Sequence, residues 1–261
     1  MILDEIVATK RVELSARRKA FPLKDLRLRA ESMPQPRDFE AALRGRSIAL
    51  IAEIKRASPS KGLLRAHAEP RAIAEAYANN GASAISILTD RQYFQGDLAD
   101  LGAARLGCQA PFLRKDFIID EYQVYESRVA QADAILLIAR LLSDTQLRDY
   151  LSLARSQGLA SVVEVHNEPE VERALIAGAT VIGINNRNLA DFTVDLGTTE
   201  RLARLVPCDR LIVSESGISS SSDVERMSHA GVDAVLVGEA LMRADNTAAA
   251  VRELAGVRKL K

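Results

Sequence analysis

Eight short apolar segments recur along the chain, and the segments between them carry helical signals. Four of these helical segments end at a glycine directly before an apolar run, at Gly81, Gly158, Gly178 and Gly231. Glycine supplies the left-handed residue that ends many helices, and a short, wholly apolar run is typical of a strand buried on both faces. The predicted strands are Ala49–Ile54, Ala84–Leu88, Phe112–Lys115, Ala134–Ile138, Ser161–Val165, Val181–Asn185, Leu211–Ser214 and Ala234–Val237.

Helix caps in the intervening segments support an alternation of strands and helices. Ser143 with Gln146 three residues later has the pattern of a capping box, and Asn167 with Glu170 repeats it. Eight strand-then-helix units predict parallel strands joined by crossovers, and eight such strands close into a barrel of ~250 residues. The 261 residues are therefore predicted to form a single α/β domain, a (β/α)8 TIM barrel.

The segment before the first predicted strand is expected to be a helical extension, residues 1–48, packed on a barrel of residues 49–261. Its first part, Ile2–Ala20, has apolar residues among charges, as an amphipathic helix does. Such a helix is also placed to cover one mouth of the barrel. The joint to the barrel is expected at Pro34, Gln35 and Pro36. The basic residues of the helix are expected to form a solvated face: Lys10, Arg11, Arg17, Arg18 and Lys19.

Composition and charge exclude several classes of protein. The chain has 35 Lys+Arg and 35 Asp+Glu, so no nucleic-acid or membrane partner is predicted on electrostatic grounds. No apolar stretch reaches the ~18 residues of a membrane span and the start lacks a secretory pattern, which favours a cytoplasmic protein. Cys108 and Cys208 have no further Cys or His at metal spacing, so we expect two buried or half-buried thiols and neither a disulfide framework nor a structural zinc site. No cofactor is expected. A monomer is expected, although the mouth and the extension each leave room for an interface.

Polar residues late in the predicted strands stand out, because an ionisable residue inside a parallel barrel is costly unless it is paired or lies at a mouth. The carboxyl ends of barrel strands meet at one mouth, where barrel enzymes place their chemistry. Two lysines and several carboxylates there form a set that burial and neighbours tune into acids and bases. For each residue alone, an ion pair or a polar rim is the alternative interpretation. These residues are Glu53, Lys55, Lys115, Glu164, Asn185, Asn186, Arg187, Ser214, Glu215 and Ser216.

Glycines after the last two predicted strands indicate a place for an anion. Gly217 and Gly238 follow these strands, where backbone N–H groups of a barrel cradle a phosphate; tight turns are the alternative explanation. The polar loop Arg56–Gly62 after the first strand suits closure over a ligand, or is an ordinary connection.

An aromatic residue and a histidine lie close to these polar positions. Phe117, just past Lys115, is expected to stack on an aromatic substrate rather than only to pack. The histidines are predicted to lie in or near helices and caps, and His166, two residues after Glu164, is the best placed of them for catalysis. They are His67, His166 and His229.

Nine stretches of the chain carry a family resemblance. They are Ile2–Val7 with Lys10 and Arg11, Ile51–Gly62, Leu88–Asp90, Tyr93–Gly96, Leu113–Ile118, Glu164–His166, Gly183–Leu189, Ser214–Ile218 and Val237–Gly238. On these motifs the chain resembles the indole-3-glycerol phosphate synthase family of tryptophan biosynthesis over essentially its whole length. The resemblance implies a lyase that converts 1-(2-carboxyphenylamino)-1-deoxyribulose 5-phosphate into indole-3-glycerol phosphate, with loss of CO2 and water.

The resemblance also implies roles for individual residues. Lys115 is then the general acid at the ketone carbonyl and Glu164 the general base, while Lys55 holds the substrate carboxylate or acts as acid in dehydration. Which lysine serves which step stays open. Glu53 orients the lysines and Asn185 bonds the reacting hydroxyl. The remaining residues implied are Glu215 near the same atoms, Ser58, Phe117, Leu136 and Arg187 on the substrate, and Ser216, Gly217, Gly238 and Glu239 at the phosphate.

Glu239 departs from the family pattern, since other members have Ser there. A carboxylate repels a phosphate dianion, so only the backbone N–H of Glu239 is expected to contribute, with its side chain turned outward.

Two alternative functions are an isomerase acting on a phosphoribosyl anthranilate and a non-catalytic barrel that binds a sugar phosphate. The first does not explain Glu53 and Lys55 beside Lys115, and all three residues argue against the second.

Overall fold

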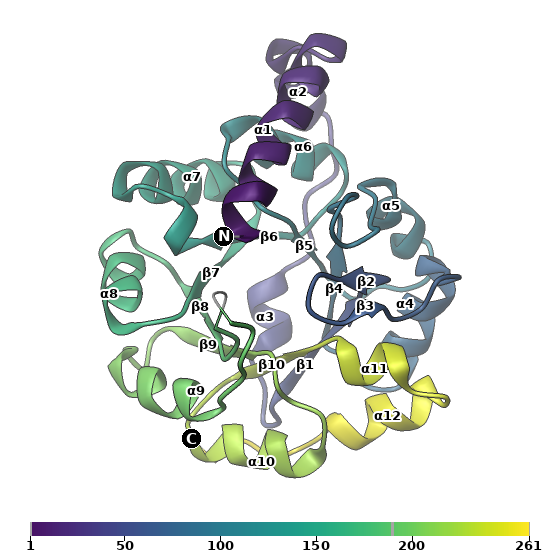
Figure 1. Cartoon of the computed structure of the whole chain (residues 1–261), viewed down its shortest axis with the longest axis vertical. Coiled ribbons are helices and arrows are strands. Elements are labelled where there is room, and N and C mark those ends of the chain that lie inside the picture. The colour runs from purple at the N-terminus through teal and green to yellow at the C-terminus, as the bar shows by residue number, and fades with distance from the viewer. Residues whose placement is uncertain (1, 189–190, 261) are drawn as a thin grey trace.

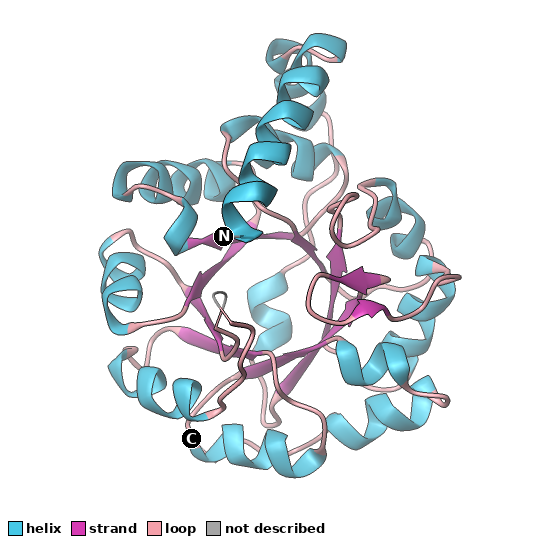
Figure 2. Ribbon diagram, in the orientation of Figure 1, coloured by secondary structure: helices cyan, strands magenta, loops and turns pink. Residues whose placement is uncertain are grey.

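One closed parallel barrel dominates the computed structural model, which describes residues 2–188 and 191–260 (Figures 1 and 2). The predicted strands are confirmed, with one added residue at the start of β7 and one at the end of β9. Leu189, part of one family motif, lies outside the described residues. In their order around the barrel the strands are β1 (Ala49–Ile54), β4 (Ala84–Leu88), β5 (Phe112–Lys115), β6 (Ala134–Ile138), β7 (Ala160–Val165), β8 (Val181–Asn185), β9 (Leu211–Glu215) and β10 (Ala234–Val237).

Helices follow the strands along the chain and surround the barrel, which confirms the predicted (β/α)8 fold (Figure 2). The capping box predicted at Ser143 is present, and the Asn167 side chain accepts the backbone N–H of Glu170 at 3.0 Å. The helices are α4 (Pro70–Asn79), α5 (Ala99–Arg105), α6 (Glu121–Val129), α7 (Asp144–Ser156), α8 (Glu168–Ile176), α9 (Gly197–Leu202), α10 (Ser221–His229), α11 (Glu239–Arg243) and α12 (Thr247–Leu254), with short 3-10 turns η1 (Ala139–Leu141) and η2 (Ala203–Leu205).

Alternation along each strand decides what faces the barrel interior. Ile51 of β1 and Val162 of β7 belong to the apolar cluster inside the barrel, and Glu53 and Glu164, two residues further on, line the pocket above it. Because side chains two apart in a strand point to the same face, the interior changes from apolar to charged towards the carboxyl ends. The outward-facing residues pack instead against the helices in a second, larger cluster.

The extension closes the amino-terminal end of the barrel with a short helix, α3 (Phe39–Leu43). Phe39 and Leu43 are buried in the interior cluster together with Ala49 and Ala84 at the starts of β1 and β4. The helix begins at Asp38, whose side chain accepts the backbone N–H of Ala41 at 2.8 Å. The opposite mouth, at the carboxyl ends of the strands, is therefore the one left for a ligand.

Two longer helices of the extension, α1 (Ile2–Ala20) and α2 (Leu23–Glu31), dock on α6 at the side of the barrel (Figure 1). Leu14, Leu26 and Tyr122 form a separate apolar cluster that joins the three helices. The first turns of α1 reach the carboxyl-terminal mouth, where Ile2, Leu3 and Ile6 line the pocket. The helix therefore covers part of the mouth. The assignment of the whole chain to a single domain stays a prediction.

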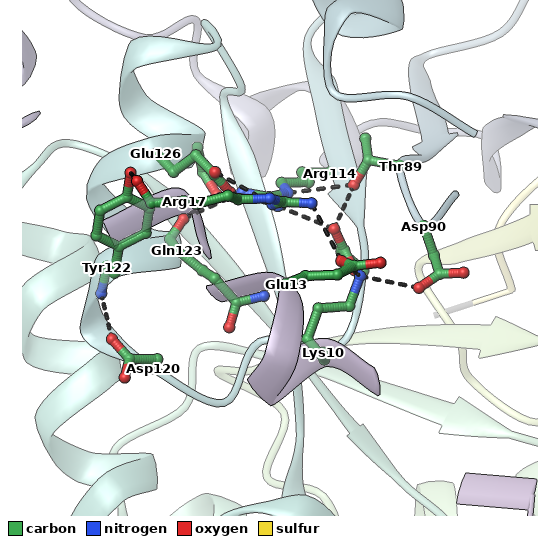
Figure 3. A network of polar contacts seen from close by, with 12 residues as sticks. Lys10, Glu13, Arg17, Thr89, Asp90, Arg114, Asp120, Tyr122, Gln123 and Glu126 are labelled. Atoms are coloured by element: carbon green, nitrogen blue, oxygen red, sulfur yellow. Dashed lines mark hydrogen bonds and ion pairs between the residues drawn. The ribbon is translucent and has the colours of Figure 1, made fainter. Parts of the chain in front are cut away.

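The prediction of a solvated basic face on α1 is wrong for Lys10, whose side chain is 0 % exposed (Figure 3). Its Nζ lies 2.8 Å from Asp90 Oδ2 and 3.1 Å from Asp116 Oδ1, at the ends of β4 and β5. Burial alone would lower the pKa of Lys10, but the two aspartates raise it above its ordinary value. A buried charge is tolerated when it is paired in this way, so Lys10 is a docking residue.

The same network continues through Arg114, which is fully buried and lies 2.9 Å from Asp116 and 2.8 Å from Glu126 (Figure 3). Arg17 of α1 is half-buried because it contacts the same Glu126, at 3.1 Å, and exposed Arg18 pairs with Asp120. Of the five basic residues predicted to form the solvated face, only Arg11 and Lys19 are exposed and make none of these ion pairs. Periodicity alone does not show which basic residues of an amphipathic helix meet a carboxylate.

The two cysteines differ in exposure. Cys108 is half-buried, as expected, and burial raises the pKa of its thiol. The prediction is wrong for Cys208, which is exposed because it lies in the turn between η2 and β9. Within residues 2–188 and 191–260, no helix has the length and apolarity to cross a membrane.

Candidate active site

A pocket at the carboxyl ends of the strands brings together all the residues to which the family resemblance assigns a role, whereas Asn186 and Ser214 do not line it and hydrogen-bond to each other at 3.0 Å. β1, β5, β7, β8 and β9 contribute the polar side chains at its floor, and the loops after β1, β8, β9 and β10 form its rim. The predicted residues that line it are Glu53, Lys55, Ser58, Lys115, Phe117, Leu136, Glu164, Asn185, Arg187, Glu215, Ser216, Gly217, Gly238 and Glu239.

Lys115 is the centre of the polar floor. Its Nζ lies 2.9 Å from Glu164 Oε2 and 3.0 Å from Glu215 Oε2. Burial alone would lower the pKa of Lys115, but Glu164, Glu215 and Glu53 together raise it, so the amine is an ammonium with protons to donate. Burial would raise the pKa of Glu164, yet the charge of Lys115 and hydrogen bonds from Lys115 and Asn185 hold it below its ordinary value. Asn185 Nδ2 donates to Glu164 Oε1 at 3.2 Å and orients that carboxylate.

The ionised form of Glu215 is disfavoured in this pocket. Burial, with the negative charges of Glu164 and Glu53 against the single positive charge of Lys115, raises the pKa of Glu215 to about 7. Its Oε1 has no hydrogen-bond partner among the described residues, and a Cβ at Gly183 would clash with it. Glycine at 183 therefore makes room for this carboxylate, and near neutral pH Glu215 holds a proton part of the time.

Glu53 and Lys55 form a second acid–base pair on β1 and just beyond it. Lys55 Nζ lies 2.7 Å from Glu53 Oε1, and the Glu53 side chain is 4 % exposed while that of Lys55 is 18 % exposed. A Cβ at Gly238 would clash with the Glu53 carboxylate. Close approach to Glu53 thus explains this glycine independently of any phosphate.

One wall of the pocket is apolar and aromatic. The rings of Phe94 and Phe117 lie 6.0 Å apart between centroids, and Leu136 of β6 lines the same pocket. Phe94 belongs to the family motif Tyr93–Gly96, but the resemblance assigns no role to it. Because Phe94 lies in a loop, hydrophobic periodicity does not predict its position, and only the structure shows that it lines the pocket.

The rim beyond β9 and β10 has the strained backbone expected of a tight turn. Ser216 and Gly217 adopt φ of 67° and 86°, and Asn186 Nδ2 donates to the Ser216 carbonyl oxygen at 3.0 Å. Gly238 precedes α11, which begins at Glu239. The Glu239 carboxylate lies 3.4 Å from Lys61 Nζ and 3.5 Å from Arg243 Nε, so these two cations hold the side chain.

The loops after β1 and β8 complete the rim. The first forms a small antiparallel hairpin of β2 (Ala57–Ser58) and β3 (Gly62–Leu63), and its Ser58 is buried in the pocket wall. In the second, the Arg187 backbone N–H donates to Asn185 Oδ1 at 3.0 Å, and Arg187 Nη1 donates to the carbonyl oxygen of Phe192 at 3.2 Å. Both loops are thus folded against the mouth.

Of the three histidines, only His166 contacts this site. Its Nε2 lies 3.4 Å from Glu164 Oε1, whereas His67 is exposed and His229 Nδ1 lies 2.9 Å from the Glu225 carbonyl oxygen on α10. Within the described ranges no group of three or more His, Cys, Asp or Glu residues is arranged to hold a metal ion.

Comparison with known proteins decides the family. The family model described as indole-3-glycerol phosphate synthase matches residues 3–254. The chain belongs to the indole-3-glycerol phosphate synthase family. Proteins named indole-3-glycerol phosphate synthase from Polaromonas naphthalenivorans (strain CJ2) and Roseiflexus sp. (strain RS-1) are 53% and 52% identical to it, and each comparison covers 98% of both chains.

Solved structures outside the indole-3-glycerol phosphate synthase family share only the fold. Thiamine phosphate pyrophosphorylase from Pyrococcus furiosus superposes with a TM-score of 0.59 at 20% identity, over 80% of this chain and 94% of that one. An N-acetylmannosamine-6-phosphate 2-epimerase from Clostridium perfringens gives 0.56 at 16% identity, over 74% and 86%. Because a barrel hosts many chemistries, these likenesses confirm the architecture and leave the activity to the site.

Proposed function

We propose that this chain catalyses the family reaction, in which 1-(2-carboxyphenylamino)-1-deoxyribulose 5-phosphate closes to indole-3-glycerol phosphate with loss of CO2 and water. The observation that carries the proposal is the ammonium of Lys115 held 2.9 Å from Glu164 and 3.0 Å from Glu215 in one pocket. An acid and a base in contact with the same bound molecule are what a ring closure followed by dehydration needs.

In the first half of the reaction, Lys115 donates a proton to the ketone oxygen while the ring carbon that bears the carboxylate attacks the carbonyl carbon. This gives a hydroxyl on the new five-membered ring and disrupts the aromatic ring. Loss of CO2 returns the bonding electrons to the ring and restores its conjugation. Lys55 would hold the departing carboxylate, and Asn185 would bond the new hydroxyl.

In the second half, the hydroxyl leaves as water after receiving a proton, and Glu164 takes a proton from the neighbouring ring methylene. The indole double bond forms from the electrons of that C–H bond. Either lysine can supply the proton for the leaving hydroxyl, since both ammonium groups line the pocket. Glu53, 2.7 Å from Lys55, and Glu215, 3.0 Å from Lys115, would keep both lysines charged and oriented.

The remaining residues would bind the parts of the substrate that do not react. The anthranilate ring would lie between Phe117 and Leu136, and Ser58 and Arg187 would bond its polar groups. The phosphate would meet the backbone N–H groups of the rim. The residues of that rim are Ser216, Gly217, Gly238 and Glu239.

We further propose that the ligand is a small molecule and that the chain has no nucleic-acid or membrane partner, which the balance of 35 Lys+Arg against 35 Asp+Glu supports. We also propose that the chain acts as a monomer in the cytoplasm. The reaction as written balances without a metal ion or an organic cofactor.

The experiment is to mix the purified chain with carboxyphenylamino-deoxyribulose phosphate in excess chelator and to follow indole fluorescence. Growth of the signal at a catalytic rate supports the proposal. Binding of the substrate without product points to the non-catalytic barrel, and turnover of a phosphoribosyl anthranilate instead points to the isomerase. Activity that disappears with chelator and returns with a metal contradicts a metal-free site.

A further inference from the structure

His166 lies between two carboxylates in the wall of the candidate site. It follows β7 directly, and its side chain is 6 % exposed. Nε2 lies 3.4 Å from Glu164 Oε1, and Nδ1 lies 3.2 Å from Glu170 Oε2 on α8. The family resemblance assigns no role to His166, and the reaction steps proposed above do not involve it.

The partner at Nδ1 is an acceptor. Glu170 Oε2 accepts the His166 backbone N–H at 2.9 Å, and Glu170 Oε1 accepts from Asn167 Nδ2 at 2.9 Å and from Arg140 Nε at 3.2 Å. Burial would raise the pKa of Glu170, yet hydrogen bonds from the side chain and the backbone of His166, with the charge of Arg140, lower it to about 2. An ionised carboxylate accepts hydrogen bonds only, so Nδ1 of His166 carries a proton.

A neutral His166 then has no proton on Nε2, and this lone pair faces Glu164 Oε1. Nε2 is buried and has no hydrogen-bond partner among the described residues, although the carboxylate oxygen is only 3.4 Å away. Of these two facing acceptors only Nε2 is unsatisfied, because Glu164 Oε1 also accepts from Asn185 Nδ2 at 3.2 Å, and one added proton between them satisfies Nε2. The geometry therefore makes Nε2 the acceptor that faces a proton arriving on Glu164.

We propose that His166 is a positioning residue that receives, through Glu164, the proton that Glu164 removes from the substrate. The proton passes from the ring methylene to Glu164 and then to Nε2, and the resulting imidazolium lies between the two carboxylates of Glu164 and Glu170. No other reactant is needed. The inference rests on the proposed role of Glu164 as general base.

A second hollow gives this proton a route to solvent. His166 and Asn167 line it on one side, and Glu164 lines only the substrate pocket, so the Glu164–His166 pair lies between the two spaces. The charged groups near the pair are Lys115 and Glu215 beside Glu164, Arg140 beside Glu170, and Arg187 and Asp195 in the lining of the hollow. When substrate fills the pocket, His166 still faces the second hollow.

The test compares the pH dependence of kcat in wild type and in His166→Gln, from about pH 5 to about pH 9. We expect kcat of the variant to be about tenfold lower on the alkaline side and KM to stay within about twofold. The difference should shrink towards acid pH, because a histidine that is protonated before the reaction cannot receive the proton. His229→Gln, which changes a histidine outside the site, is the matched control and should equal wild type.

A second variant separates proton transfer from a structural role. His166→Ala opens space next to the second hollow, and added imidazole should restore part of its kcat while leaving Lys115→Ala unaffected. An unchanged kcat in His166→Gln, or a loss that is equal at every pH and not rescued in His166→Ala, overturns the inference. An active wild type with either result overturns this inference alone, whereas an inactive wild type overturns the proposed function and the inference with it.

Discussion

Lys10 Nζ on the first helix lies 3.1 Å from the carboxylate of Asp116, the residue that directly follows Lys115. The helix of the extension is thereby tied to the end of the strand that carries the proposed acid. Arg114, on the other side of Lys115 in the chain, belongs to the same buried network. Docking of the extension and the position of Lys115 are therefore coupled through neighbouring residues.

Lys10→Met should destabilise the fold, because it leaves Asp90 and Asp116 buried without their shared cation. We expect the free energy of unfolding to fall by about 3–5 kcal/mol, as when one partner of a buried pair is removed. Urea unfolding measures this, with the exposed Arg11→Met as matched control, for which a change within about 0.5 kcal/mol is expected. Equal stability of the two variants would show that the pairs around Lys10 contribute nothing.

Glu215→Gln should stabilise the fold at alkaline pH and have little effect at acid pH. The folded state keeps the Glu215 proton up to about pH 7, whereas the unfolded chain loses it near 4.5, so wild-type stability falls as pH rises between these values. Glutamine mimics the neutral carboxyl, so the gain should grow over this range to about 3 kcal/mol at most. Urea unfolding at pH 5 and pH 8 gives the two differences, and the same difference at both pH values would contradict the raised pKa.

Glu239→Ser should leave substrate affinity equal or slightly improved. The Glu239 carboxylate pairs with Lys61 and Arg243, and its charge would repel a bound phosphate dianion. KM for the carboxyphenylamino-deoxyribulose phosphate measures the effect, with Glu168→Gln, at an exposed position of α8, as a control for loss of a surface charge. A large increase in KM would mean that the side chain itself binds the substrate.

The sequence predicted the barrel and the gathering of the site residues because both follow from local rules. A strand places every second residue on one face, so Glu164 after Val162 had to face the interior, and parallel strands carry such residues to one mouth. This holds for Glu53, Lys115, Asn185 and Glu215 alike.

Other features depend on contacts between distant segments and left no local signal. The amphipathic pattern of α1 did not distinguish buried Lys10 from exposed Arg11, because the two aspartates that pair with Lys10 come from β4 and β5 ends about 80 and 106 residues away. Phe94 lines the pocket from a loop, and a loop has no periodic pattern from which this position could be predicted. Likewise, the position of His166 between Glu164 and Glu170 required the packing of α8 against β7.

The central claim is that Lys115 and Glu164 act as acid and base on the bound substrate, and the turnover number of Lys115→Ala tests it most directly. With saturating substrate, kcat should fall by ~10²–10⁴-fold relative to wild type, while the urea unfolding curve stays cooperative. Exposed Lys24→Ala serves as the matched control and should keep the wild-type rate. A folded Lys115→Ala variant that retains near-normal kcat would remove Lys115 from the chemistry and contradict the account.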